Sequence, residues 1–145
     1  MQPVRRYGRM GRIMNAVPKS LVPFIGPKQR AVLNSMLRGE EREYFANMLH
    51  DLSDRVQRMP KTGEADSDDA IVYLHYFMGS IDAWITERDM GDGTADKSQH
   101  QAFGMVDLGY GPELGYISLP ELFGSGVEID LHWTPKPLNE IKAAV

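Results

Sequence analysis

The sequence predicts an α+β fold in which N-terminal helices pack on a four- to five-stranded antiparallel sheet. Two observations point to this class. Up to Pro60 the apolar residues recur every three or four positions, which is the period of a helix. From Ala70 onward they form short β-branched and aromatic runs separated by turns, which is typical of strands. Helices followed by a run of strands is the order expected of an α+β domain.

The chain has 145 residues, and we expect a single α+β domain over residues 14–145. Residues 1–13 hold four arginines without apolar periodicity. They are interpreted either as a disordered basic arm or as a non-native extension before a natural start at Met14. The absence of cysteine excludes disulfides, thiolate metal sites and thiol nucleophiles. It also suits a reducing compartment, so a cytoplasmic location is expected.

The N-terminal half is expected to hold an extended segment and two helices. Residues 15–26 contain two prolines among apolar residues, so they are predicted to run extended over the core. Pro27 suits the first position of a helix and Gly39 its end. A second helix over 40–59 carries acids in its first turn and arginines in its last, as the helix dipole favours. The expected anchors of the three segments are Leu21, Val22, Phe24 and Ile25, then Ala31, Val32, Met36 and Leu37, then Phe45, Met48, Leu49, Leu52, Val56 and Met59.

The C-terminal half is expected to form an antiparallel meander. Its predicted strands cover residues 70–78, 83–88, 101–108, 113–117 and 127–133. Turns are predicted at 79–80 and 109–112, where glycines cluster. Ser118 lies three residues before Glu121, which matches a capping box and predicts a short helix after it. A last helical turn is expected over 139–144.

The charge is unevenly divided between the two halves. Residues 1–63 hold 12 Lys/Arg and 5 Asp/Glu, a balance of +7, whereas residues 64–145 hold 4 and 15, a balance of −11. The acidic half, with its loops at 64–69 and 89–96, is either an ordinary solvated face or a surface for a basic partner. Arg5, Arg6, Arg9 and Arg12 offer nonspecific phosphate contacts. No helical pair, finger or aromatic-studded basic strand accompanies them, so direct nucleic-acid binding is not expected.

Four carboxylates lie near the ends of neighbouring predicted strands, namely Glu87, Asp89, Asp107 and Glu113. If they converged they would suit Mg²⁺ binding or acid–base chemistry, as in a metal-dependent hydrolase or nuclease. Arg88 is the nearby cation, but in a strand it points away from Glu87. The favoured alternative is that Glu87 and Asp107 accept hydrogen bonds from turn amides and that Asp89 is solvated. No catalytic residue, metal ligand or cofactor is therefore assigned.

The histidines lack the spacing of a zinc site, so structural roles are expected for them. His75 shares a strand face with Phe77, and His132 shares one with Asp130, which would allow an Asp–His pair. The glycine-rich run at 109–115 has no lysine or following helix and therefore predicts a tight turn rather than a phosphate loop. Tyr110 and Tyr116 beside it are candidates for an exposed recognition surface.

Part of the sequence resembles an uncharacterised family of small bacterial proteins that are encoded on plasmids, integrative elements and phages. The likeness is carried by the runs WITERD at 84–89, FG at 103–104, DLGYGPELGYISLPEL at 107–122, DLHW at 130–133 and PKPL at 135–138. It covers roughly residues 70–141, and the segment 123–129 is shorter than the corresponding stretch of the family. The resemblance implies a mobile-element setting and a cytosolic protein, and it transfers no activity.

The sequence therefore favours a non-enzymatic accessory protein of a mobile genetic element. We expect it to bind a host defence or nucleic-acid-handling protein through an acidic surface. The expected surface consists of Glu87, Asp89, Asp107, Tyr110, Glu113 and Tyr116. The alternative from a different class is the metal-dependent hydrolase or nuclease built on the clustered carboxylates. Convergence of those carboxylates in one pocket would distinguish the two.

Overall fold

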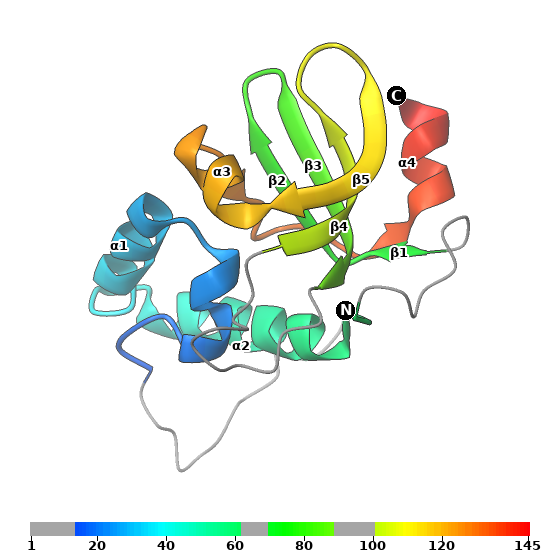
Figure 1. Ribbon diagram of the computed structural model, residues 1–145. Helices are drawn as coiled ribbons and strands as arrows, with labels where there is room; N and C mark the ends of the chain where they lie inside the picture. Colours follow the sequence, from blue (N-terminus) through cyan, green and yellow to red (C-terminus); the bar gives the residue numbers. More distant parts are fainter. Residues whose placement is uncertain (1–13, 62–69, 89–100) are drawn as a thin grey trace.

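The computed structural model describes residues 14–61, 70–88 and 101–145. It confirms the α+β class: helices pack on a five-stranded antiparallel sheet with the strand order β5-β4-β3-β2-β6 (Figure 1). Its strands are β2 (Leu74–Met78), β3 (Ile81–Arg88), β4 (Gln101–Asp107), β5 (Pro112–Ser118) and β6 (Glu128–Ile129). A second, two-stranded sheet pairs β1 (Ile71–Val72) with β7 (Lys136–Pro137). The arginines of residues 1–13 lie outside the described residues.

The helices cover both faces of the sheet. One face carries the 3₁₀ helix η1 (Lys19–Phe24), α1 (Pro27–Met36), α2 (Arg42–Arg58) and α3 (Leu119–Gly124). The other face carries α4 (Leu138–Ala144) (Figure 1). Leu138 and Ile141 of this helix pack with Trp84 and Met105. The expected stripe is confirmed in the buried residues Leu49, Leu52 and Val56 of α2 and in Met59 at its C-terminal cap. The sheet is therefore the middle layer of the domain.

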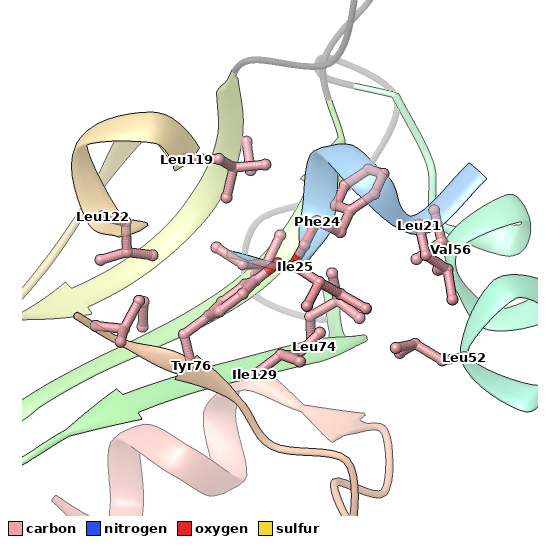
Figure 2. Close-up of a cluster of buried hydrophobic side chains, with 14 of the residues drawn as sticks. Leu21, Phe24, Ile25, Leu52, Val56, Leu74, Tyr76, Leu119, Leu122 and Ile129 are labelled. Atoms are coloured by element: carbon pink, nitrogen blue, oxygen red, sulfur yellow. Dashed lines mark hydrogen bonds between the residues drawn. The ribbon is translucent and has the colours of Figure 1, made fainter. Parts of the chain in front are cut away.

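The larger core joins the N-terminal segment to the sheet (Figure 2). Leu21, Phe24 and Ile25 are fully buried against β2, and the hydroxyl of Tyr76 donates a hydrogen bond to the Phe24 carbonyl. Burial raises the pKa of the Tyr76 phenol, because the ionised form would lose its hydration. Tyr76 thus fixes the N-terminal segment on the sheet through one polar contact inside an apolar cluster.

The N-terminal segment differs from the prediction in its shape, and four of the anchors expected in this segment and in α1 are exposed. Lys19–Phe24 forms a 3₁₀ helix where the whole segment was expected to run extended, and Val22 is exposed. Proline holds φ near the value that a 3₁₀ turn needs, so Pro23 is compatible with this conformation. In α1 the buried side chain is Leu33, followed by Leu37 at the C-terminal cap. Ala31, Val32 and Met36, which were expected to be core residues, are exposed.

Two predicted strands are shorter than expected. The strand over 70–78 is divided at Tyr73, because its first residues pair with β7 instead of β3. The strand over 127–133 ends after Ile129. There the Asp130 side chain accepts a hydrogen bond from the His132 amide, and the Asp130 carbonyl accepts one from the Trp133 amide. This local turn sends Trp133 to the opposite sheet face, where its indole N–H donates to the Val72 carbonyl at 3.0 Å.

Candidate interaction surface

Two hairpin turns lie side by side at one end of the sheet (Figure 1). Gly79 and Ser80 join β2 to β3, and residues 108–111 join β4 to β5. The register aligns Asp82 with Asp107, and a side chain at Gly109 would lie only 3.4 Å from the Ser80 hydroxyl oxygen. Gly79, Gly109 and Gly111 have positive φ, which explains why glycine occupies these turn positions.

Asp107 organises the longer turn. One of its carboxylate oxygens accepts hydrogen bonds from the amides of Gly109, at 2.8 Å, and Gly111, at 3.2 Å. This confirms the expectation that Asp107 binds turn amides. The carboxylate therefore stabilises the loop that presents Tyr110.

Large apolar side chains are exposed on these turns. Tyr110 is 97% exposed and Leu108 is 56% exposed, and Phe77 and Met78 at the neighbouring turn are also exposed. Carboxylates lie among them along the same end of the sheet, as the strand register shows. We call this set the hairpin-end surface. It comprises Phe77, Asp82, Asp107 and Glu128 on one face of the sheet, Met78 and Glu113 on the other, and Leu108 and Tyr110 on the turn between β4 and β5. The segments that form it, 76–83, 105–114 and 127–129, contain no Lys or Arg.

His75 fastens one of these carboxylates to the sheet. Its Nε2 lies 2.8 Å from an oxygen of Asp82, and its Nδ1 lies 3.2 Å from an oxygen of Asp130. The ring also stacks with Phe77 and Trp84, at centroid distances of 5.8 and 5.7 Å. His75 thereby connects β2, β3 and the residue after β6.

The predicted Asp–His pair involves a different histidine. Asp130 binds the ring of His75, whereas the contact of His132 with Asp130 is made by its backbone amide. The prediction paired neighbours along one strand, but the strand ends before His132. Burial lowers the pKa of the Arg55 guanidinium, and the Asp51 carboxylate opposes that shift more than the Asp130 carboxylate does.

The expected carboxylates do not converge among the described residues. Glu87 is buried, with 6% exposure, and pairs with Phe103, four positions along β4 from Asp107. Four residues of strand span about 13 Å. Glu113 pairs with Val106 and therefore points to the sheet face opposite to Asp107. Asp89 and the acidic loops at 64–69 and 89–96 lie outside the described residues.

The tyrosines of the expected surface occupy one hairpin. Tyr110 is at its tip, and Tyr116, 68% exposed, lies farther along β5, where its ring packs edge to face on Phe103. Sequence reasoning missed Leu108, Phe77 and Met78. Only Leu108 gave a signal, as an apolar residue directly before the glycine turn.

Within 14–61, 70–88 and 101–145, no group of three His, Asp or Glu side chains is placed to hold a metal ion. Over the same ranges no helix is both long and apolar enough to cross a membrane. No protein-family model, curated protein or solved structure matches the chain. The resemblance carried by residues 107–122 stays a prediction.

Proposed function

We propose that the protein is a non-enzymatic, cytoplasmic accessory protein of a mobile genetic element that binds a host defence or nucleic-acid-handling protein. The binding site is the hairpin-end surface. The observation that carries the proposal is the exposure of Tyr110 and Leu108 among carboxylates, in segments that contain no Lys or Arg. Contiguous exposed apolar side chains on a small domain mark interaction sites, and tyrosine is frequent among residues that dominate binding energy.

The carboxylates determine which partner fits. Asp82, Asp107, Glu113 and Glu128 give this end of the sheet a negative field, which steers a partner with a basic surface. Proteins that handle nucleic acid carry such surfaces because they neutralise phosphates. Among the expected surface residues, Asp107, Tyr110 and Glu113 belong to this site. Glu87 does not, because its side chain is buried.

The test is capture from a host lysate by the full chain, followed by measurement of the dissociation constant with the purified captured protein. The Leu108→Ser/Tyr110→Ser variant removes the apolar part of the site. Val32→Ser/Met36→Ser, on the exposed side of α1, is the matched control. We expect the first variant to weaken binding by at least about 30-fold, the size of a hot-spot loss, and the control to leave it unchanged.

Salt dependence tests the acidic part of the same site. Raising the salt to about 0.5 M should weaken the complex strongly, because the charges facing each other at its rim are screened. Both variants must keep the wild-type circular dichroism spectrum. The proposal would be overturned if the captured protein binds Leu108→Ser/Tyr110→Ser as tightly as wild type, or if its dissociation constant does not change with salt.

A further inference from the structure

The two edge strands of the sheet, β6 and β5, differ in what binds the backbone groups on their outer side. At the β6 edge the side-chain amide of Gln29 binds the backbone of Ile129 twice. Its Nε2 donates to the Ile129 carbonyl at 3.0 Å, and its Oε1 accepts from the Ile129 amide at 2.8 Å. At the other edge, no strand of the described ranges pairs with the outer side of β5. An unpaired edge presents alternate backbone N–H and C=O groups that can add another strand.

β5 lacks most features by which natural edge strands avoid pairing. Its seven residues follow the register of β4 without a bulge, and they contain no Lys or Arg. Pro112, which has no N–H, is confined to the first position. Leu114 and Tyr116 are 42% and 68% exposed, and they lie on the same face of the sheet. Among the described residues, the strand therefore offers both an edge without a partner strand and exposed apolar side chains.

We propose that two copies of this chain associate through antiparallel pairing of their β5 strands, with the two-fold axis at Gly115. This register overlaps the whole strand. Leu114 of each copy then lies opposite Tyr116 of the other copy. The two identical pairs stand on either side of a central Gly115–Gly115 pair. Cross-strand aliphatic–aromatic pairs stabilise antiparallel sheets.

The charges and shapes in this register are compatible with a second copy as the occupant. Glu113 faces Ile117 of the other copy, so the single acidic residue of β5 does not meet itself. Gly115 has open space around the position of a Cβ atom, so nothing there blocks close approach. A two-fold contact must be self-complementary, and a strand whose apolar pair is symmetric about its own centre meets that condition.

The association leaves most of the hairpin-end surface outside the joined strands, and Glu113 is the one residue that belongs to both. In an antiparallel pair the two β4–β5 turns lie at opposite ends of the joined sheet, so the turn that carries Tyr110 and Leu108 lies beyond the paired residues 112–118, level with the start of α3 of the second copy. The dimer does not depend on the proposed partner, and it is measured on the purified chain alone. A failure of one proposal therefore leaves the other standing.

Cysteine cross-linking tests the register directly, since the wild-type chain has no cysteine. Gly115→Cys places two thiols on the axis, where opposite Cα atoms in an antiparallel pair are about 4.5 to 5.5 Å apart, within the range of a disulfide. In Glu113→Cys the two thiols would be about four residues, roughly 13 Å, apart, which is too far. We expect mild oxidation to cross-link Gly115→Cys and not Glu113→Cys.

Sedimentation equilibrium measures the association itself. We expect a concentration-dependent dimer for wild type. Leu114→Lys/Tyr116→Lys, which puts cations on the edge, should raise its dissociation constant at least about tenfold. Val32→Lys on α1 should not change it. A wild-type monomer at all concentrations, equal cross-linking of both cysteine variants, or a dimer that Gly115→Cys fails to capture would overturn the proposal. If the lysine variant does not fold, the cysteine pair still decides.

Discussion

The side-chain amide of Gln29 binds Ile129 with the same pair of hydrogen bonds that a neighbouring strand would provide. Gln29 lies on α1 and is half-buried. The contact closes the short edge strand β6, which would otherwise present its backbone to solvent at the boundary of the core. α1 is therefore attached to the sheet by polar contacts as well as by the packing of Leu33.

Replacing Gln29 with Leu should lower the free energy of unfolding by about 2 kcal/mol, because both backbone groups of Ile129 lose their partner. Gln29→Glu keeps an acceptor for the Ile129 amide but has no donor for the carbonyl, so a loss of about 1 kcal/mol or more is expected. Urea denaturation measures both changes. Lys28→Ala, at the exposed neighbouring position, is the control and should change stability by less than about 0.5 kcal/mol. Equal stability of Gln29→Leu and wild type would contradict this role.

Tyr76→Phe should destabilise the fold by about 1 to 3 kcal/mol at neutral pH, because the buried Phe24 carbonyl loses its donor. The pKa of Tyr76 is raised in the folded protein, so the unfolded chain loses this phenolic proton first. The contribution of Tyr76 is thus fully present below about pH 10 and declines above it, by at most about 1.4 kcal/mol per pH unit. Denaturation curves between neutral and alkaline pH should show the difference between wild type and Tyr76→Phe shrinking only above that pH.

Gly104→Ala should be among the most damaging single substitutions in the sheet. A Cβ atom at Gly104 would lie 2.0 Å from the backbone carbonyl oxygen of Trp84, so the central strands would have to separate. Overpacking of this kind costs about 1 to 3 kcal/mol and more where backbone must move, so we expect a loss above about 3 kcal/mol. Gly124→Ala is the matched control, because a Cβ there meets no atom within 4 Å. Thermal unfolding gives the melting temperature of each variant. Similar values would contradict the close approach of Gly104 to the Trp84 carbonyl.

His75→Phe keeps an aromatic ring among Phe77, Trp84 and Trp133 but removes the ring nitrogens that contact Asp82 and Asp130. Both carboxylates are partly exposed, so the expected loss is modest, about 1 kcal/mol. Adding Asp82→Asn and Asp130→Asn to His75→Phe should recover part of it, because two carboxylates no longer face an apolar ring. The melting temperatures of the three proteins test this order. If the melting temperature of the triple variant is no higher than that of His75→Phe, the two carboxylates do not depend on the histidine ring.

The elements whose signals are local were predictable from the sequence. The Ser118 side chain accepts from the Glu121 amide, as the capping box predicts, and Pro27 begins α1. The β4–β5 hairpin and its glycine turn are also confirmed. Each of these features depends on residues only a few positions apart.

The features that the sequence did not reveal depend on contacts between distant segments. His75 meets Asp130 across 55 positions, and nothing near either residue marks the other as its partner. Apolar and polar residues alternate along the predicted strand over 127–133, as in a strand. The turn at Asp130 nevertheless ends the pairing of this segment with β2. The hairpin-end surface depends on the register of β3 and β4, which sets Asp82 opposite Asp107 beside the two turns. Periodicity alone contains no information about that register.

The bond between Gln29 and Ile129 spans 100 positions, and this has a consequence for the order in which the chain is made. Ribosomes add roughly 5 to 20 residues per second, so α1 emerges about 5 to 20 s before the strand that holds its amide exists. Hairpins form within microseconds, so β2–β3 and β4–β5 can each close as soon as they emerge. The N-terminal helices are therefore made before the sheet on which they pack is complete. Slower translation lengthens the lifetime of this partly folded intermediate.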